Sequence, residues 1–284
     1  MANLAAIYEY MGQWTEAEKL MIQVLDTTNR ILGMEHPDTI NAMENLASTY
    51  RDLGRYTEAE KLGIQVLDAR NRILGVEHLE TMNAMGSLAA TYQHLRKYTE
   101  AEKLQIQVLD ATNRILGVQH PHTIRAMAQL ALTYQYLEKY TEAEELMIQV
   151  LDAKNRILGV EHPDTINAME NLAATYQYMG QYTEAEKLEM QVLDARNRIL
   201  GVQHPQTITA MMNLAATYKC LGRYAEGEIL QIQAQEAQSK VFAGEPFHKI
   251  NTMSNVKESQ ESQVLGARSV LPNTIMNPGK KGVE

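Results

Sequence analysis

A module of 42 residues, written about six times in succession, constrains this chain more than any other feature. Two columns show the spacing most clearly, one of leucine and one of tyrosine: Leu4, Leu46, Leu88, Leu130, Leu172 and Leu214, and Tyr8, Tyr50, Tyr92, Tyr134, Tyr176 and Tyr218. The stretch YTEAEKL is repeated at 56, 98 and 182. Copies of one module bury apolar surface mainly against their neighbours, so the sequence predicts a linear array rather than one globular core.

Charge and composition narrow the classes of partner. The net charge is −9 and the isoelectric point is about 5.5, which argues against a nucleic acid or an anionic membrane surface as partner. Cys220 is the single cysteine, so the chain forms no internal disulfide and fits a reducing compartment. No apolar run reaches the roughly 20 residues that span a bilayer. These features predict a soluble, cytoplasmic protein.

Each module is expected to form two helices. In the module that begins at His36, Pro37 is suited to a first helical turn. The apolar residues that follow step by three and four, which predicts one buried stripe: Ile40, Met43, Leu46, Ala47, Tyr50 and Leu53. Gly54 is expected to end this helix. Arg96 and Glu138 replace that glycine in two modules, where the turn is expected to close differently.

The second helix of the same module is expected to begin with a capping box. Thr57 and Glu60 stand three residues apart, as the reciprocal Thr–Glu cap requires. The helix is predicted to run from Thr57 to Leu74 and to end at Gly75. Its apolar stripe is expected to contain Ala59, Leu62, Val66, Ile73 and Leu74.

Five histidines occupy one position of the module: His36, His78, His120, His162 and His204. Each stands between the glycine that ends one helix and the first turn of the next, so we expect it to cap backbone groups or pack at the corner between modules. A metal site needs several ligands that converge, and these histidines belong to successive modules. We therefore predict no metal site and no bound cofactor.

These residues resemble the tetratricopeptide repeat (TPR). The resemblance covers about residues 1–243 and rests on the pattern Leu46-Ala47, Tyr50, Gly54, Tyr56 and Ala59. The connector LGxEHPDT and the eight further residues are similar to the 42-residue repeats of kinesin light chains and to arrays at the C-termini of STAND (NB-ARC or NACHT) sensor proteins. The resemblance implies an all-α fold, a right-handed α-solenoid of about six helix-turn-helix units.

One column departs from that pattern, because many TPRs carry a bulky core residue there. It reads Met21, Gly63, Gln105, Met147, Glu189 and Gln231. We expect Leu62 and Ile64 to fill the space beside Gly63.

Both ends of the array look unfinished. Met1 falls in the column of Met43, so the first unit is expected to be truncated at its N-terminus. Residues 244–284 are expected to hold the remnant of a seventh repeat, followed by a disordered tail. Neither end shows a polar capping helix, so apolar surface is expected at the ends and self-association through them stays open.

The concave face of such an array is expected to be lined by the first helix of each unit. One outward column there is rich in carboxamides: Asn3, Asn45, Ser87, Gln129, Asn171 and Asn213. A carboxamide both donates and accepts hydrogen bonds, so it can pair with the backbone of an extended peptide. In peptide-binding TPRs, asparagines of the matching column make this contact, so the resemblance implies a peptide groove. The alternative is that these amides bond only to the adjacent helix.

Five other residues of this face are candidates for contacts with a peptide. Arg51, Arg125 and Lys219 could meet acidic groups, although Glu44 and Glu170 share the surface. The side chains of Tyr136 and Tyr178 could support partner residues or be partly exposed packing.

No catalytic motif is present, and like residues are spread along a line rather than gathered in a pocket. We therefore predict a non-enzymatic module that binds a protein or peptide partner. The alternative is a structural fragment of a larger multidomain sensor, in which the array serves self-association or domain regulation.

Overall fold

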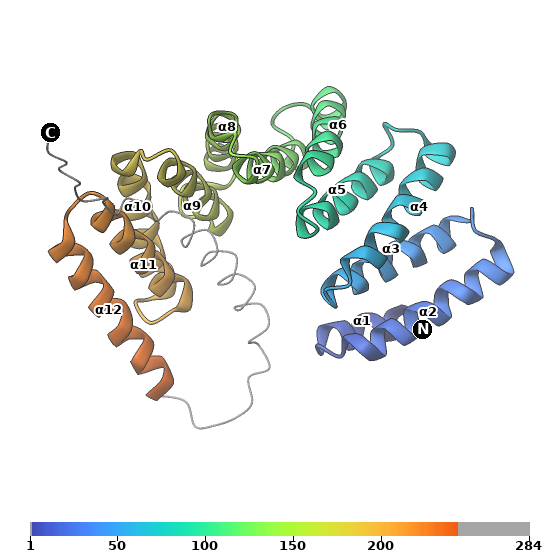
Figure 1. Ribbon diagram of the computed structural model, residues 1–284, viewed down its shortest axis with the longest axis horizontal. Helices are drawn as coiled ribbons and strands as arrows, with labels where there is room; N and C mark the ends of the chain where they lie inside the picture. Colours follow the sequence, from blue (N-terminus) through green and yellow to red (C-terminus); the bar gives the residue numbers. More distant parts are fainter. Residues whose placement is uncertain (1, 244–284) are drawn as a thin grey trace, which may run out of the picture. The chain divides into compact units, whose positions relative to one another are not determined.

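The computed structural model describes residues 2–243, which form twelve α-helices (Figure 1). Their bounds are α1 Ala2–Tyr10, α2 Trp14–Leu32, α3 Pro37–Asp52, α4 Tyr56–Leu74, α5 Leu79–His94, α6 Tyr98–Leu116, α7 Pro121–Tyr136, α8 Tyr140–Leu158, α9 Pro163–Tyr178, α10 Tyr182–Leu200, α11 Pro205–Cys220 and α12 Tyr224–Ala243. The seventh-repeat remnant and tail predicted for 244–284 lie outside the described residues.

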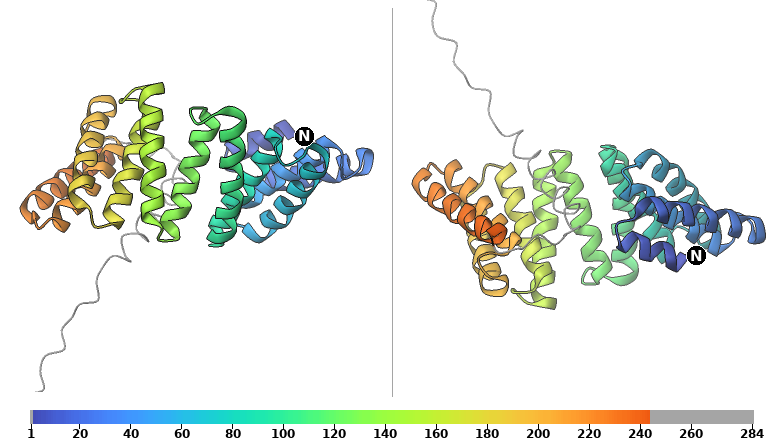
Figure 2. Two further views of the ribbon diagram at one scale, coloured as in Figure 1. Left: turned by 90° about the horizontal axis from the view of Figure 1, so that it is seen from above. Right: turned by 90° about the horizontal axis from the view of Figure 1, so that it is seen from below.

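Successive helices form six antiparallel pairs, which we number units 1 to 6 from α1–α2 to α11–α12. Every helix packs against the next one in the chain, both within a unit and between units. The views in Figure 2 show the pairs stacked one after another along the array. In Figure 1, α5, α7 and α9 lie on the inner side of the curve and α6, α8 and α10 on the outer side. The predicted all-α solenoid of helix-turn-helix units is confirmed.

The core repeats with the sequence, because each unit buries the same columns. Met43 and Leu46 are almost fully buried in α3, and so are their equivalents in units 3 to 6. Met43 packs with Ile40 of its own helix, with Val66 of α4, and with Ala84 of the following unit. The core is therefore shared between neighbouring units rather than contained in any one of them.

The recurrent histidine caps the first helix of each of units 2 to 6. In unit 5, His162 has an extended backbone and its Nδ1 accepts a hydrogen bond from the amide of Asp164 at 3.1 Å. The other four histidines accept the same bond at 3.2 Å. This bond satisfies one of the free amides at the helix start, so the predicted capping role is confirmed.

The turn between the two helices of a unit has one geometry throughout, and the expectation of a different closure at Arg96 and Glu138 was wrong. Gly54 has φ of 73°, and Arg96 and Glu138 adopt φ of 57° and 59° in the same place. The amides of Gly54 and Arg96 bond to the carbonyl three residues earlier in the same way. The packing of the units thus imposes a left-handed backbone even where the residue carries a Cβ.

The capping box predicted for the second helix was also wrong. The helix begins at Tyr56, with Arg55 at its N-cap and no side-chain cap. Arg55 Nε donates to Glu58 at 2.9 Å, whereas Glu60 accepts from Lys97 of the following unit at 2.6 Å. Glu60 is drawn to this lysine and does not fold back onto its own helix.

Two further expectations about second helices fail. Ile73 and Leu74 lie in the last turn of α4 and are 45% and 38% exposed, because α4 has 19 residues and its partner α3 only 16. The space beside Gly63 is filled by Leu88 of the next unit, whose Cδ1 lies 3.1 Å from the place that a Cβ on Gly63 would take. Ile64, expected to fill it, is 47% exposed.

The two ends of the described array differ. Leu4 of α1 is 45% exposed, whereas its equivalent Leu46 is buried, so apolar surface is present at the first unit as expected. On α12, Ile229 is 58% exposed, so apolar surface is present at this end too, although the exposed Gln235 stands where α10 carries Leu193. Among residues 2–243, no helix has the length and hydrophobicity to span a membrane.

Candidate functional site

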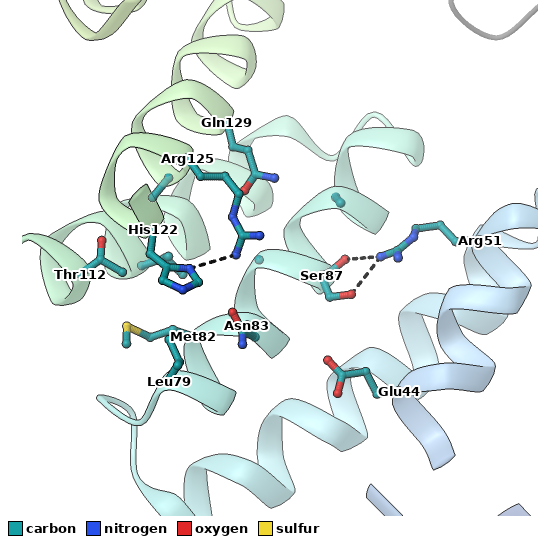
Figure 3. Close-up of a pocket in the computed structure, with 14 residues that line it drawn as sticks. Glu44, Arg51, Leu79, Met82, Asn83, Ser87, Thr112, His122, Arg125 and Gln129 are labelled. Carbon is teal, nitrogen blue, oxygen red and sulfur yellow. Dashed lines mark hydrogen bonds between the residues drawn. The ribbon is translucent and has the colours of Figure 1, made fainter. Parts of the chain in front are cut away.

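A groove of about 570 Å³ opens on the inner face over units 2 to 4. Its walls come from α3, α5 and α7, with two residues from α6. Figure 3 shows Arg125 and Gln129 extending from α7, while Asn83 and Ser87 belong to α5. Three first helices thus share one surface, as the sequence predicts for this face.

The groove is deep at unit 3 because two residues there are small. In unit 2, Glu44 accepts a 2.7 Å hydrogen bond from Arg70, which is almost fully buried. Unit 5 carries the equivalent pair, Glu170 and Arg196, at 2.6 Å. The same positions in unit 3 are Gly86 and Thr112, and a Cβ added to Gly86 would meet nothing within 4 Å.

The acidic member of the unit 5 pair, Glu170, is largely but not fully buried. Burial raises the pKa of the Glu170 carboxyl above its ordinary value, and the nearby Arg196 only partly offsets this. Arg196 is also held by the carbonyl of Gln206 at 2.8 Å. The Glu–Arg pairs of units 2 and 5 each connect a first helix, a second helix and the following unit. Their side chains fill the space that stays open at Gly86 and Thr112 in unit 3.

Of the carboxamide column, Ser87 and Gln129 line this groove, whereas Asn45, Asn171 and Asn213 hold the equivalent positions of α3, α9 and α11 outside it. Asn45 and Gln129 are exposed, and Asn171 and Asn213 are half-buried. Within residues 2–243, the side-chain amides of these four residues form no hydrogen bond to another protein group. Asn3 lies in α1, but its side chain is outside the described part. Ser87 differs, because its hydroxyl accepts from Arg51 at 3.0 Å.

The three cations predicted for this face have different surroundings. Arg51 donates to the carbonyl and hydroxyl of Ser87, both at 3.0 Å, so it links units 2 and 3. Lys219 donates to Gln231 at 2.6 Å, within unit 6. Arg125 is exposed on the groove wall, and within residues 2–243 its guanidinium approaches Nδ1 of His122 at 3.4 Å (Figure 3). Arg125 is therefore the most accessible of the three.

Tyr136 and Tyr178 each stack on the first residue of the preceding second helix. The ring centroids of Tyr136 and Tyr98 lie 4.8 Å apart, and those of Tyr178 and Tyr140 lie 5.6 Å apart. The other faces stay accessible, since Tyr136 is 55% and Tyr178 40% exposed. Each ring therefore packs against the array with one face and is also exposed enough to contact a partner residue.

Sequence reasoning missed a polar network between units, behind the groove. Gln93 donates to Thr133 of the next unit at 2.7 Å, and Thr133 donates to the buried Gln105 at 2.6 Å. Gln135 donates to Thr175 at 2.7 Å. The signal in the sequence is the polar column that contains Gln105, which departs from the family pattern.

In unit 5 the same column carries a carboxylic acid, Glu189, which is almost fully buried. Its Oε1 accepts from Gln177 at 2.7 Å, and its Oε2 is buried without a hydrogen bond. Burial raises the pKa of Glu189 to about 7, against hydrogen bonds to Thr217 and Gln177 that lower it. The carboxyls of Glu170 and Glu186 raise it slightly further.

Comparison with known proteins agrees with this architecture. The tetratricopeptide-repeat family model matches residues 1–72, 42–110, 80–156, 125–198 and 164–240. A solved kinesin light chain repeat array from Podospora anserina, described as having nearly identical TPR-like repeats, is 31% identical with a TM-score of 0.67. The match covers 73% of this chain and 99% of that one.

Two other solved structures share the fold at low identity. BtubC (BKLC) from P. vanneervenii is 16% identical with a TM-score of 0.70, and the match covers 84% of this chain and 96% of that one. The apo form of RapI is 9% identical with a TM-score of 0.62, over 86% of this chain and 98% of that one. No curated protein sequence matches the chain.

The family model spans nearly all of the described helices, and the solved array from Podospora anserina is similar over almost its full length. Repeats of this kind generally serve as protein-interaction modules without catalytic activity. This chain belongs to the tetratricopeptide-repeat family.

Proposed function

We propose that the array holds an extended peptide segment of a partner protein in the groove lined by its first helices. The observation that carries this proposal is the carboxamide column, whose amides at Asn45, Gln129, Asn171 and Asn213 have no hydrogen-bond partner within the described protein. Each amide offers a donor and an acceptor, which are the two groups that an extended backbone needs. Such contacts hold a backbone without reading its sequence.

The deep part of the groove beside Gly86 and Thr112, which we call the recess, supports the same proposal. A side chain of the peptide can enter the groove there. Its floor and walls mix apolar residues such as Met82 and Val108 with the polar ends of Asn83 and Arg125. Binding sites commonly combine an apolar surface with a few polar groups that fix orientation. The amides then hold the backbone, and the recess at unit 3 adds selectivity for one side chain.

In this proposal Arg51 and Lys219 do not contact the peptide directly, and they stabilise the helices that form the groove wall. Both donate hydrogen bonds to protein groups, so they shape the groove wall and are less accessible than Arg125. Tyr136 and Tyr178 supply accessible ring edges beside the groove. A chain with a single cysteine needs no oxidising compartment, so we propose the reducing cytoplasm as its location.

The first test is a proteome-wide peptide-display selection against the full chain. The enriched peptides are then measured against Asn45→Ala/Asn171→Ala/Asn213→Ala. We expect this triple variant to weaken binding by about 10-fold or more, roughly what the loss of one or two net hydrogen bonds costs. The matched control is Asn71→Ala/Asn155→Ala/Asn197→Ala, which removes three exposed asparagines from second helices and should bind normally.

A second variant fills the recess without removing any amide. Gly86→Glu/Thr112→Arg installs in unit 3 the ion pair that Glu44 and Arg70 form in unit 2. We expect loss of binding with an unchanged melting temperature. A well-folded array that enriches no peptide, or binding that neither variant weakens, would overturn the groove proposal. That result would favour the alternative of a scaffold within a larger sensor protein.

A further inference from the structure

The last turn of each second helix exposes apolar residues that the groove does not use. In unit 2 these are Ile73 and Leu74, followed by Val76 in the connector to unit 3, which is 48% exposed. The same three positions are exposed and apolar in each of units 1 to 5. We call these fifteen residues the connector edge. The isoleucine column represents it: Ile31, Ile73, Ile115, Ile157 and Ile199.

The exposure follows from the lengths of the helices. Ile73 continues the buried stripe of Val66 and Ala69 by one further turn. The first helix against which that stripe packs has 16 residues, three fewer than α4, so the last turn of α4 extends past it. The surface is thus the end of a core stripe that its own unit does not cover.

The connector edge has the size of a stable interface. A large aliphatic side chain carries roughly 100 Å² of apolar surface, given its transfer free energy. The fifteen residues are between 36% and 69% exposed, so together they present roughly 700 Å². Stable complexes bury about 800 Å² on each partner, so the apolar side chains of the edge alone supply most of the area that a stable dimer needs.

The charges beside the connector edge are paired with one another. Arg72 binds Glu35 at 2.7 Å, and Arg198 binds Glu161 at 2.6 Å; Arg114 pairs with Glu77 in the same way. Each pair joins the end of a second helix to the connector before its unit. Arg72 and Arg198 also bind Asp68 and Asp194, so charges of both signs alternate beside the edge and form no single-sign patch. Two copies could approach along this edge without strong charge repulsion.

We propose that the connector edge pairs with the connector edge of a second copy of this chain. A second copy presents the same apolar residues at the same spacing, which a partner of another architecture would not match over several units. An antiparallel, two-fold arrangement brings unit 3 of one copy against unit 3 of the other, and units 2 against units 4. This surface lies along the array, and none of its fifteen residues lines the inner groove.

The test is sedimentation of the full chain across the micromolar range. We expect a concentration-dependent dimer, which Ile73→Ser/Ile115→Ser/Ile157→Ser converts to monomer. The matched control, Ile64→Ser/Ile106→Ser/Ile148→Ser, changes three isoleucines of similar exposure on another face of the same helices. It should leave the dimer intact. A wild-type chain that stays monomeric, or a control that dissociates equally, would overturn the proposal.

Disulfide crosslinking tests the same arrangement while leaving most of the connector edge unchanged. In a Cys220→Ser background, Val118→Cys of unit 3 should form a disulfide-linked dimer in high yield on treatment with diamide, because the two-fold axis places the two thiols together. Ile106→Cys, on the other face of α6, should remain monomeric. Equal yields from the two variants would contradict the proposed arrangement even if the serine variants fail to fold.

Discussion

Units 3 and 5 are copies of one module, yet they differ in the groove, in a buried polar residue and in a turn. Unit 3 carries an open recess, a buried Gln105 and a left-handed Arg96. Unit 5 fills the recess with Glu170 and Arg196 and buries a carboxylic acid, Glu189. The fold is the same in both, so the module tolerates changes that alter the groove and the stability of individual interfaces. Variation within a constant scaffold is how a repeat array can acquire local specificity.

The largest expected effect comes from exchanging the buried polar residue. The pKa of Glu189 is about 7 in the folded chain, above its ordinary value of 4.5. Between these pH values the unfolded chain loses this proton and the folded chain retains it, so the free energy of unfolding falls as pH rises. The loss is on the order of 3 kcal/mol and is complete above pH 7. Glu189→Gln should remove it.

Urea unfolding of both chains at several pH values between about 5 and 8 tests this prediction, with amide hydrogen exchange in α10 and α11 to locate the change. The two chains should be similar near pH 5, and the variant should be more stable at pH 8. Gln105→Glu is the matched exchange, and it should give unit 3 the pH dependence of unit 5. A pH dependence that persists in Glu189→Gln would refute the assignment.

A smaller effect is expected at the turn between the two helices. Arg96 of unit 3 has φ of 57°, whereas Gly180 of unit 5 adopts 73° without a Cβ. Arg96→Gly should therefore stabilise the chain by about 1 kcal/mol, and Gly180→Arg should destabilise it by a similar amount. Thermal unfolding of the two variants measures both signs. If both lower the melting temperature, side-chain contacts of Arg96 outweigh its backbone strain.

The smallest effect concerns the ion pairs that link successive units. Lys97 of unit 3 binds Glu60 of unit 2 at 2.6 Å, but unit 5 has Gln181 at the position of Lys97, while unit 4 keeps Glu144 at the position of Glu60. Gln181→Lys should add the missing pair and raise the melting temperature slightly at low salt, since exposed pairs contribute little. Lys97→Gln should have the opposite effect. The same shifts at high salt would show that the cause is not electrostatic.

Features that depend on neighbouring residues in the sequence were predicted well. The caps at His36 and its equivalents follow from a glycine before and a helix start after each histidine, and the burial of Met43 and Leu46 follows from helical spacing. A groove was also expected on the first helices, and α3, α5 and α7 line most of the one observed. The assignments of Asn45, Asn171 and Asn213 to peptide binding remain predictions.

Features that depend on contacts between different helices were predicted poorly. The partners of Arg51, Glu60 and Glu189 lie 36, 37 and 12 residues away in the sequence, so helical spacing did not reveal them. The capping box looked complete at Thr57 and Glu60, but a lysine of the next unit competes for the glutamate.

By itself, the sequence determined the number of units, the two helices of each and their buried columns, because a 42-residue period and helical spacing are local properties. Only the tertiary structure decided where the groove is open, which cations are engaged and which apolar residues stay exposed. The recess at Gly86, the exposed Ile73 and the buried Glu189 all depend on how far a neighbouring helix extends and what it carries. In a solenoid, each residue's burial depends on its neighbouring units as well as its own.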